Sequence, residues 1–288
     1  MTPLIAHPAV FRRDLAVIAV TGEDRTAYLH ALLSQDVAGA RVGSAADFLL
    51  LDHKGSPLAA GRLLVTAGAV LLLAPTSVVD PLVEMLRGRT FLMDATTEVL
   101  AWAVASVRGP GEVGVPGARS DAMTAAPHGD GFVVRDRSGG VDVVGPVAWV
   151  DERVEGLGLP VAETADWERW RVAHGEPAWG AEIAEGRRAQ ELGLLPTHVH
   201  LRKGCYPGQE SIAKIHNLGR PKRALALVES EAPLAVSGAM TSVAQLDGRS
   251  VGLAFVSAGS SAGDRLEVDG VPVVVTRLIG AGLPQPGA

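Results

Sequence analysis

Hydrophobic and polar positions in the first third of the chain predict strands and helices in alternation. The run LAVIAVTG, residues 15–22, predicts a buried strand that ends in a turn. Residues 22–37 carry apolar side chains at helical spacing, with acidic residues in the first turn. Three short apolar runs of strand length follow within residues 47–75, and residues 77–88 show an amphipathic helical pattern. This part of the chain is therefore expected to combine sheet and helix.

The middle of the chain mixes predicted strands, one loop and one helix. Residues 91–95 and 98–107 have the apolar character of strands, whereas the Gly-, Pro- and Ala-rich stretch 109–130 predicts a surface loop. Residues 131–145 predict a hairpin with a Gly-Gly turn. A second clear helix is predicted for residues 164–175, where three large side chains share one side: Trp167, Trp170 and His174.

Beyond Pro221 the pattern changes to short strands separated by Asp-Gly turns, without a helical period. Such a pattern predicts a separate small β barrel or sandwich. The expected fold class is therefore α+β with an all-β C-terminal part.

The composition narrows the class of protein. A chain of 288 residues corresponds to roughly two domains, with one or three also compatible. The net charge of −6 argues against a general nucleic-acid binder, although a local basic patch is compatible with it. No apolar stretch reaches the ~18 residues of a membrane span, and the N-terminal apolar run is too short for a signal peptide. We therefore expect a soluble, cytoplasmic protein with no membrane partner.

The only cysteine of the chain, Cys205, stands in the stretch KGCYPGQE, residues 203–210. One cysteine excludes a disulfide within the chain and a Cys-rich zinc or iron–sulfur site, and it fits a reducing compartment. The two glycines of the stretch allow a sharp turn or a close approach to a ligand, and Pro207 stiffens the loop. Lys203 and the start of a short helix after the loop both favour the thiolate form. A tight structural loop with an incidental cysteine is the alternative.

Two polar clusters adjoin this stretch. His198 and His200 would share one face if residues 197–205 were a strand, and with the nearby thiol they could form a three-ligand metal site. The alternative is that both histidines line a cleft or face solvent. The basic stretch 214–223 could receive a carboxylate-rich or phosphate-bearing partner, or it could be an ordinary solvated surface.

The stretch KGCYPGQE closely resembles the signature of the YgfZ family, folate-binding proteins related to the aminomethyltransferase (T-protein) of the glycine cleavage system. Four other segments resemble further parts of that family: residues 22–37, 52–63, 167–183 and 216–225. The resemblance spans about residues 1–230 by motif and the remainder by its barrel-like character. The family often has threonine where this chain has Pro207, a difference that leaves the thiol intact.

The resemblance implies a three-part ring around a central folate pocket. Residues 1–47 together with 130–220 would form a discontinuous first α+β domain, and residues 48–129 an inserted α+β domain. Residues 221–288 would form the C-terminal β-barrel domain.

The resemblance also implies a role in building or maintaining iron–sulfur proteins, including enzymes that modify tRNA. In relatives the signature cysteine is the functionally important residue, and its counterpart here is Cys205 with Lys203 beside it. The cofactor would be tetrahydrofolate or a derivative. The protein partners would be iron–sulfur proteins or assembly factors bound transiently, and no direct binding of nucleic acid is expected.

One departure from the aminomethyltransferase pattern bears on the chemistry. Those enzymes carry an aspartate pair after the glycine of the segment that reads DHKGSPLAA here, and the matching positions are Ala59 and Ala60. An alanine can neither hold a proton nor orient a folate nitrogen. The resemblance therefore implies that glycine-cleavage chemistry is lost, and Asp52 is not an obvious substitute.

Folate contacts are assigned by the same resemblance. The pterin ring has an amide-like edge that a carboxylate can bind through two hydrogen bonds, and Asp142 stands where relatives have a glutamate. Arg171 matches an arginine that faces the ligand in relatives, and Tyr206 and Gln209 of the signature are expected contacts as well. Trp170 or Trp179 could supply an apolar wall, or both could be ordinary core residues.

Three functions remain open from the sequence. The first is a folate-binding accessory protein of iron–sulfur metabolism in which Cys205 acts as the functional thiol. The second is a folate-dependent one-carbon transferase of unknown acceptor. The third is a non-catalytic module whose loop docks a partner protein.

Overall fold

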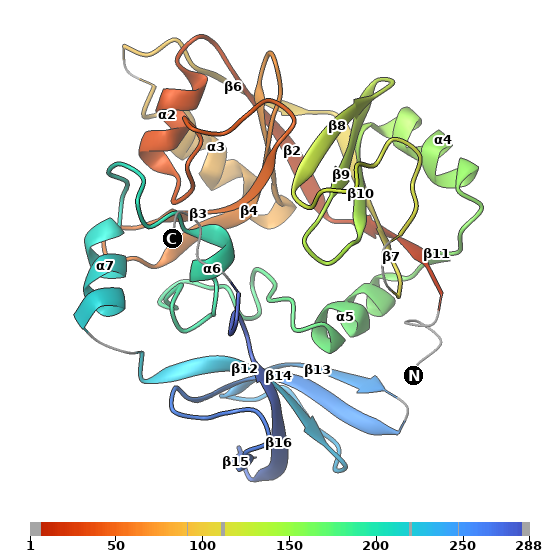
Figure 1. The fold of residues 1–288 in the computed structure, drawn as a ribbon, viewed down its shortest axis with the longest axis vertical. Helices are drawn as coiled ribbons and strands as arrows, with labels where there is room; N and C mark the ends of the chain where they lie inside the picture. Colours follow the sequence, from red (N-terminus) through yellow and green to blue (C-terminus); the bar gives the residue numbers. More distant parts are fainter. Residues whose placement is uncertain (1–6, 91, 111–112, 219–220, 247, 284–288) are drawn as a thin grey trace. The chain divides into compact units, whose positions relative to one another are not determined.

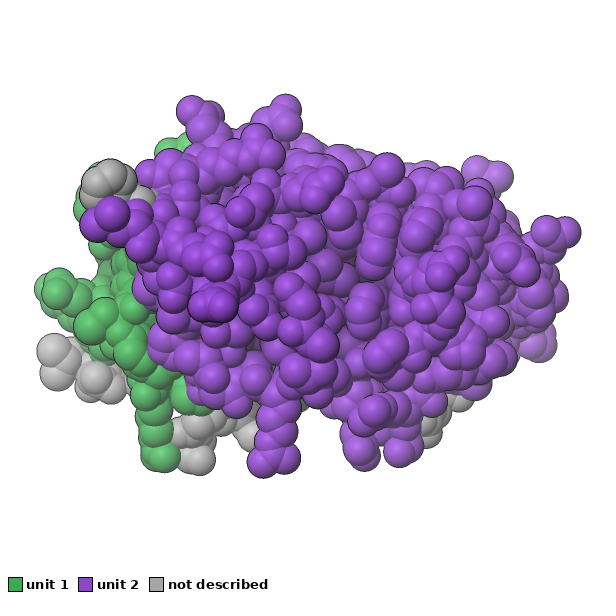
Figure 2. All heavy atoms as spheres, turned by 90° about the horizontal axis from the view of Figure 1, so that it is seen from above, with its two compact units in different colours: residues 1–2, 49–58, 165–288 green, residues 3–48, 59–164 purple. Residues whose placement is uncertain are grey.

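The computed structural model describes residues 7–90, 92–110, 113–218, 221–246 and 248–283 (Figure 1). It divides into two compact units, shown in different colours in Figure 2. Unit 1 consists of residues 1–2, 49–58 and 165–288, and unit 2 consists of residues 3–48 and 59–164. The three-domain division that the resemblance implies stays a prediction.

The first sheet of unit 2 has six strands in the order β11-β1-β7-β10-β9-β8. Their bounds are Val161–Ala162, Ala9–Arg13, Trp102–Arg108, Val141–Pro146, Gly131–Arg135 and Thr124–His128. The short β11 pairs in parallel with β1, and the other neighbours are antiparallel. The predicted hairpin of residues 131–145 is confirmed as β9 and β10.

A second, five-stranded sheet has the order β3-β4-β5-β2-β6. Its strands are Ala45–Leu51, Pro57–Val65, Val70–Pro75, Leu15–Thr21 and Thr96–Leu100. The four apolar runs of the N-terminal third are thus strands, as predicted. Residues 49–51 and 57–58, at the end of β3 and the start of β4, are grouped with unit 1.

The core of unit 2 lies on both faces of the six-stranded sheet. Between the two sheets, β7 and β10 contribute Val104 and Val144, which pack with Leu71 and Leu73 of β5. On the other face, the helix α4 (Val147–Gly156) packs Val150 against the sheet. Burial of these branched side chains, about 1.5–3 kcal/mol each, holds the layers together.

Two helices lie beside the five-stranded sheet, α2 (Arg25–Leu32) and α3 (Val79–Arg87), the latter preceded by a short 3-10 turn, η1 (Thr76–Val78) (Figure 1). The buried hydroxyl of Tyr28 in α2 donates a hydrogen bond to the carbonyl of Leu86 in α3. The helix predicted from the amphipathic pattern of residues 77–88 is therefore confirmed, and its C-terminal end is tied to α2.

Unit 1 contains a five-stranded antiparallel sheet in the order β13-β14-β12-β16-β15. The strands are Met240–Leu246, Arg249–Ser257, Arg223–Ser230, Val271–Leu278 and Arg265–Val268. One face carries a core that includes Val228, Ala254 and Val273. The predicted all-β C-terminal part is confirmed. Within the described residues β13 and β15 form no pairing that would close the sheet into a barrel.

Three helices of unit 1 precede this sheet: α5 (Thr164–Ala173), α6 (Leu195–His198) and α7 (Gln209–Leu218). α5 is the helix predicted from residues 164–175, and Gly175 follows it at φ +65°. No helix within the described ranges is both long and apolar enough to span a membrane.

Three expectations about local structure are wrong or incomplete. Residues 92–95 form turns rather than the predicted strand, and Phe91 lies outside the described residues. The predicted loop of residues 109–130 contains the strand β8, which pairs with β9. The strand β1 and the helix α4 had no prediction, because both lack a long periodic pattern of their own.

Candidate functional site

The side chain of Cys205 is exposed in the loop between α6 and α7. Its neighbours are not: Lys203 and Tyr206 are each only 7% exposed. The Lys203 ammonium lies 5.0 Å from the centroid of the Tyr206 ring, a cation–π contact that fixes both side chains. The loop therefore exposes the thiol to solvent while the side chains of Lys203 and Tyr206 are buried.

Gly208 ties this loop to the chain around residue 55. Its φ of +80° is a conformation that residues with a Cβ rarely adopt. A Cβ added there would lie 2.5 Å from the carbonyl oxygen of Asp52 and 3.0 Å from the Cα of Gly55. The glycine of the signature is thus required by backbone contact within unit 1.

The opposing loop, residues 52–56, is organised by Asp52. Its carboxylate accepts hydrogen bonds of 2.8 Å from the backbone amides of Lys54 and Ser56. The Ser56 hydroxyl accepts a hydrogen bond from the Gly186 amide at 2.7 Å and lies 3.2 Å from the Arg187 carbonyl, to which it donates. Asp52 therefore stabilises the loop, and the expectation that it does not replace the missing aspartates stays a prediction.

The helix α7 begins directly after the signature loop. The backbone amide of its first residue, Gln209, donates to the Tyr206 carbonyl at 3.3 Å, and the Ile212 amide donates to the Gly208 carbonyl at 3.2 Å. Gln209 itself is half-buried. Burial raises the pKa of Tyr206 to about 12. The phenol is therefore a neutral hydrogen-bonding group at physiological pH.

Trp170 lies in the middle of an aromatic stack on α5. Its ring centroid is 5.2 Å from that of Trp167 and 4.1 Å from that of His174. The shared helix side predicted for these three residues is confirmed. The stack buries Trp170 to 3% exposure, so the core role considered for it is observed, and the role as a folate wall stays a prediction.

Arg171 is buried among acceptors supplied by unit 1. Its guanidinium donates to Glu168 at 2.8 Å, Glu182 at 3.1 Å and Ser242 at 2.8 Å. Burial disfavours the charged guanidinium, but the hydrogen bond that Arg171 donates to Glu168 and the charge of Glu182 raise the pKa of Arg171. The residue joins α5 to the C-terminal sheet, and its predicted contact with folate is not tested by these interactions.

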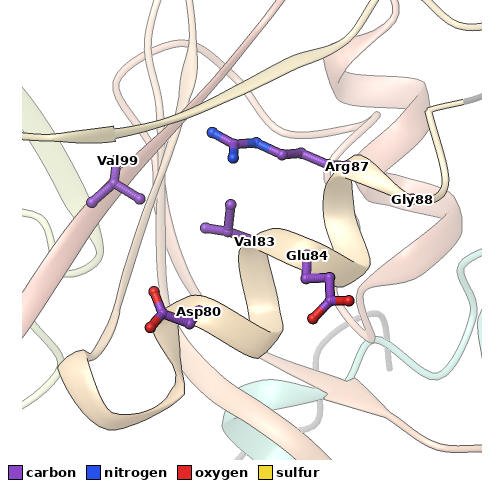
Figure 3. A pocket seen from close by; sticks show the side chains of 6 residues that line it. All are labelled: Asp80, Val83, Glu84, Arg87, Gly88 and Val99. Atoms are coloured by element: carbon purple, nitrogen blue, oxygen red, sulfur yellow. The ribbon is translucent and has the colours of Figure 1, made fainter.

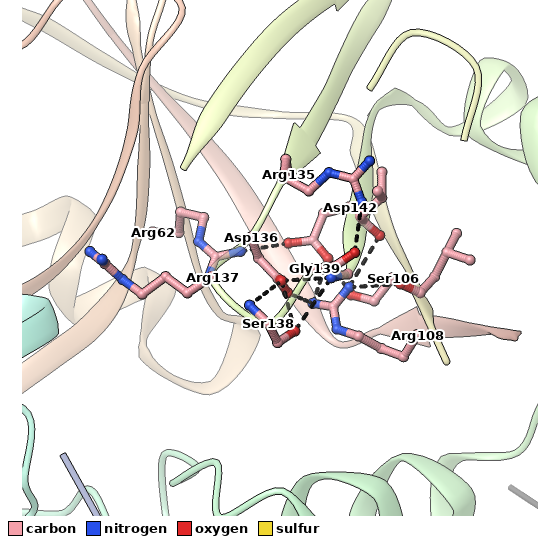
Figure 4. A network of polar contacts seen from close by, with 12 residues as sticks. Arg62, Ser106, Arg108, Arg135, Asp136, Arg137, Ser138, Gly139 and Asp142 are labelled. Carbon is pink, nitrogen blue, oxygen red and sulfur yellow. Dashed lines mark hydrogen bonds and ion pairs between the residues drawn. The ribbon is translucent and has the colours of Figure 1, made fainter. Parts of the chain in front are cut away.

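Asp142 lies in unit 2, where it stands at the centre of a buried ion cluster (Figure 4). One carboxylate oxygen accepts from Arg108 at 2.8 Å and Ser106 at 2.7 Å, and the other accepts from Arg62 at 2.8 Å. Burial alone would raise the pKa of Asp142, but the charges of Arg108 and Arg62 lower it well below its usual range. Both oxygens are thus engaged by donors of the chain itself.

The cluster extends to two more acids. Arg62 also pairs with Asp47 at 2.9 Å, and Arg108 pairs with Asp136 at 2.8 Å. Arg137 lies 3.5 Å from Asp47 and is more exposed than the rest. The acids and arginines of this group alternate in charge and are poorly hydrated. Each ion is therefore stabilised only while its oppositely charged neighbours are present. We refer to these residues as the Asp142 cluster: Asp47, Arg62, Ser106, Arg108, Asp136 and Asp142.

Ala59 and Ala60 lie on β4, shortly before Arg62. They are 1% and 6% exposed, and they bring no carboxylate to this strand. The match of these two positions to the aspartate pair, and the loss of glycine-cleavage chemistry that it implies, stay predictions.

A separate hollow of about 600 Å³ lies on unit 2 between α3 and β6 (Figure 3). Its lining residues are Asp80, Val83, Glu84, Arg87, Gly88 and Val99. None of the residues predicted to bind folate contributes to this hollow.

The two histidines before the loop do not share the face of a strand. His198 ends the short helix α6, and its Nδ1 lies 2.7 Å from the Thr197 hydroxyl. No group of three or more His, Cys, Asp or Glu side chains placed to hold a metal ion is found among the described residues. In the basic stretch 214–223, Arg220 lies outside the described residues.

The structure thus separates the predicted site residues into two groups. Four of them form one continuous loop and helix start, and two more belong to α5 of the same unit: Lys203, Cys205, Tyr206, Gln209, Trp170 and Arg171. Asp142 belongs to the other unit. Sequence reasoning missed the arginines that hold Asp142 and the loop around Asp52. Only the Asp-x-x-Gly-Ser turn pattern of the latter could have indicated it.

Comparison with known proteins gives relatives at low identity. No protein-family model matches the chain. A chloroplast protein of Arabidopsis thaliana described as a putative transferase is 24% identical over 269 residues, which cover 82% of this chain. The chain spans only 58% of that relative's length.

Bacterial relatives are named tRNA-modifying protein YgfZ. The one from Colwellia psychrerythraea is 22% identical over 228 residues, covering 76% of this chain and 70% of the relative. The one from Vibrio vulnificus strain CMCP6 is 24% identical over 224 residues, covering 74% and 67%.

Among solved structures, the aminomethyltransferase T of the glycine cleavage system from Bartonella henselae superposes with a TM-score of 0.82. The match covers 97% of this chain and 88% of that protein at 19% sequence identity, so it demonstrates a shared fold. The predicted α+β fold and the resemblance to the YgfZ family and its aminomethyltransferase relatives are thereby confirmed.

Proposed function

We propose that this chain, similar to the YgfZ proteins, binds tetrahydrofolate or a derivative and supports iron–sulfur enzymes that modify tRNA. Cys205 is the functional thiol in this proposal, and Lys203 is the cation that accompanies it. A cytoplasmic location suits a chain whose single thiol is unprotected.

One observation carries the proposal: the only thiol of the chain is exposed on a loop whose backbone is fixed from both sides. Gly208 packs against the loop of residues 52–56, and Lys203 and Tyr206 are buried beneath. A cysteine kept for packing is usually buried among apolar side chains, whereas a reactive one is accessible. The placement of Cys205 therefore supports a chemical or recognition role over a structural one.

The folate part of the proposal is supported by the fold shared with an aminomethyltransferase, and the tRNA part by the names of the bacterial relatives. Ala59 and Ala60 speak against aminomethyl transfer, because no carboxylate is present there to assist a folate nitrogen. Folate would then serve as a bound ligand that helps to set the state of the protein. A one-carbon transfer would need another acidic side chain to assist the folate nitrogen.

A single cysteine cannot ligate a whole iron–sulfur cluster, which requires several thiolates or equivalent ligands. Cys205 would instead share one ligand position transiently with a partner protein. The exposed position of the loop also favours the second candidate, a docking surface that a partner recognises without using the thiol.

Folate binding is tested by calorimetry with tetrahydrofolate. Wild-type protein is expected to bind, and Gln209→Ala is expected to weaken binding about tenfold, since a lost hydrogen bond to a ligand corresponds to roughly 1–1.5 kcal/mol. Glu210→Ala is the matched control, because Glu210 is the exposed next residue of the same helix turn. An absence of heat with wild-type protein would remove folate from the proposal.

The role of the thiol is tested in cells that depend on this protein for tRNA modification. Cys205→Ser is expected to abolish the iron–sulfur-dependent modification while folate binding by the purified variant stays unchanged. If the modified nucleoside is formed at the wild-type level, the thiol is dispensable and the docking candidate replaces the first proposal. Replacing Glu210, an exposed residue five positions away, by Ala serves as control for the surface of the same loop and helix.

A further inference from the structure

Two arginines from separate segments of unit 1 lie over the ring of one phenylalanine. The guanidinium carbon of Arg187 is 4.2 Å from the centroid of the Phe255 ring, and that of Arg223 is 5.0 Å from it. Phe255 is 7% exposed, so the two guanidinium groups cover a ring of the sheet surface. Stacking of this kind holds arginine head groups in a defined place.

The backbone explains why the two arginines meet. On the antiparallel pair β12 and β14, Leu225 is opposite Phe255, and Arg223 is opposite Ser257. Arg223 therefore lies diagonally across from Phe255 on the same face of the sheet. The segment that carries Arg187 is attached to β12 by a hydrogen bond of 2.7 Å from the Leu225 amide to the Glu191 carbonyl.

The positive charge of the two arginines at Phe255 is greater than the negative charge of the acidic side chains beside them. The carboxylate of Glu191 lies 3.3 Å from Arg223, and within the described residues Arg187 has no ion pair with an acid. Burial, and next the charge of Arg223, lower the pKa of Arg187, while Glu191 opposes this. Two like charges held over one ring are stabilised when an anion binds between or beside them.

The pair belongs to a wider basic surface next to the loop of Cys205. The guanidinium of Arg188 lies 3.4 Å from the hydroxyl of Ser211 in the first turn of α7. The Arg187 carbonyl accepts the hydrogen bond from Ser56, in the loop against which Gly208 packs. Lys222, adjacent to Arg223, is exposed as well, and the exposed acids of these segments are Glu185 and Glu210.

We propose that Arg187 and Arg223, with Arg188 and Lys222 beside them, bind phosphate groups of an RNA strand and so place tRNA directly at the Cys205 loop. The inference rests on the proposed function and replaces the expectation that nucleic acid is not bound. Guanidinium groups fixed by stacking match the fork geometry of phosphate oxygens. Cations spread over the 186–191 segment and the start of β12 suit a polyanion that runs across several elements better than a single small ion.

The test is fluorescence anisotropy with a labelled, unmodified tRNA transcript at salt concentrations between about 50 and 200 mM. The double variant Arg187→Gln/Arg223→Gln is expected to bind at least tenfold more weakly than wild type. Its slope of log affinity against log salt should be smaller by about 1.4–1.8, the value for two lost phosphate contacts.

The matched control is Arg249→Gln/Arg265→Gln, which removes the same charge from the same sheet. Arg249 begins the strand that carries Phe255, and Arg265 begins the edge strand β15. Equal tRNA affinity of the two double variants would overturn the proposal, as would wild-type protein that fails to bind tRNA at the lowest salt. A polyglutamate peptide that binds more tightly than tRNA would overturn it as well, in favour of a carboxylate-bearing partner.

Two further measurements keep the result interpretable. Circular dichroism shows whether the glutamine variant is folded; if it is not, Arg188→Gln/Lys222→Gln replaces it, with an expected loss of about threefold to tenfold and a correspondingly smaller salt slope. Equal affinity of that variant and wild type would then overturn the proposal. Calorimetry with tetrahydrofolate separates the two proposals, since the arginine variants should bind folate as wild type does.

Discussion

The Asp142 cluster and the Cys205 loop treat their polar groups in opposite ways. In the cluster, an ionised carboxylate is removed from solvent and every oxygen of Asp142 accepts from an arginine or a serine of the chain. In the loop, the thiol is exposed to solvent while the nearby side chains of Lys203 and Tyr206 are buried. The ion pairs and hydrogen bonds of the cluster stabilise the fold. In the loop, the fold instead keeps one thiol exposed.

Substitutions in the Asp142 cluster should therefore affect stability, and substitutions at the exposed thiol should affect function. A buried ion that loses its partner stays desolvated and unpaired, which is costly. An exposed thiol that becomes a hydroxyl changes little in packing. Substitution of a buried ion should therefore destabilise the protein most, and substitution of the exposed thiol should leave its stability unaltered.

Replacing Asp142 should have the largest effect on stability. Asp142→Asn removes the negative charge between Arg62 and Arg108, which are both well shielded from solvent, and should lower the free energy of unfolding by about 3–5 kcal/mol. Because the pKa of folded Asp142 lies below the unfolded value of roughly 3.9, its contribution is present above that pH and is lost as the pH falls further. Urea unfolding of wild type and variant at pH 7 measures the difference.

The control for this substitution is Asp151→Asn in the same unit. Asp151 pairs with Arg12 at 2.6 Å, but both side chains are about half exposed, at 54% and 43%. Exposed pairs contribute about 0–1 kcal/mol. A similar loss for both variants would mean that burial does not distinguish the Asp142 cluster from an ordinary surface pair.

Gly208→Ala should be the next largest perturbation. The added methyl would meet the Asp52 carbonyl oxygen at 2.5 Å, in a backbone conformation that already disfavours alanine. We expect a loss of about 2 kcal/mol or more and faster alkylation of Cys205 at neutral pH, as the loop separates from residues 52–56.

Gly270→Ala measures the part of that loss in stability that comes from the backbone conformation alone. Gly270 has a nearly identical φ of +84°, and a Cβ there would meet nothing within 4 Å. Its alanine variant should lose only about 1 kcal/mol, without any change in the rate of alkylation. Equal losses in urea unfolding would show that the contact with Asp52 carries no weight.

The burial of Tyr206 predicts an intermediate effect that appears only at high pH. Both tyrosines of the chain, Tyr28 and Tyr206, have a pKa raised to about 12 by burial. A raised pKa means that stability is fully present below pH ~10, the unfolded value, and declines as the pH rises toward 12. Absorbance at 295 nm should therefore show no tyrosinate near pH 10, and Tyr206→Phe should halve the later transition. Half of the signal titrating near pH 10 would place one ring in solvent.

Cys205→Ser should have the smallest effect on stability. The thiol is exposed, so the expected change in the free energy of unfolding is within about 0.5 kcal/mol. Since the chain has one cysteine, alkylation by a maleimide should modify one site in the native protein and none in the variant. A loss of several kcal/mol on substitution, or a native protein that resists alkylation, would assign Cys205 to the core instead.

Elements with a strong local pattern could be predicted from the sequence. The helix α5 was found because three aromatic rings recur at helical spacing, and the structure stacks them as expected. The strand β8 was missed because Thr124–His128 is short, contains a proline and is surrounded by loop residues. Its stability comes from pairing with β9, a partner that the local sequence does not reveal.

Only part of the candidate site could likewise be predicted from the sequence. The Cys205 loop was located because glycine, proline and a unique thiol stand next to one another in the sequence. The environment of Asp142 could not be predicted, since Arg62 and Arg108 are 80 and 34 positions away. Arg108 reaches Asp142 through the pairing of β7 with β10, and Arg62 reaches it from the other sheet of unit 2. A charged residue's partners are set by register, and no residue pattern within one strand encodes them.

The contact between Gly208 and the backbone around Gly55 affects which fragments of the protein can fold and when the loop can form. Residues 49–58 belong to a unit whose largest part begins only at residue 165. A fragment starting at residue 165 would lack the surface that shapes the thiol loop. During synthesis, residues 49–58 are made long before Gly208, so the contact that shapes the loop can form only after the later segment has been added.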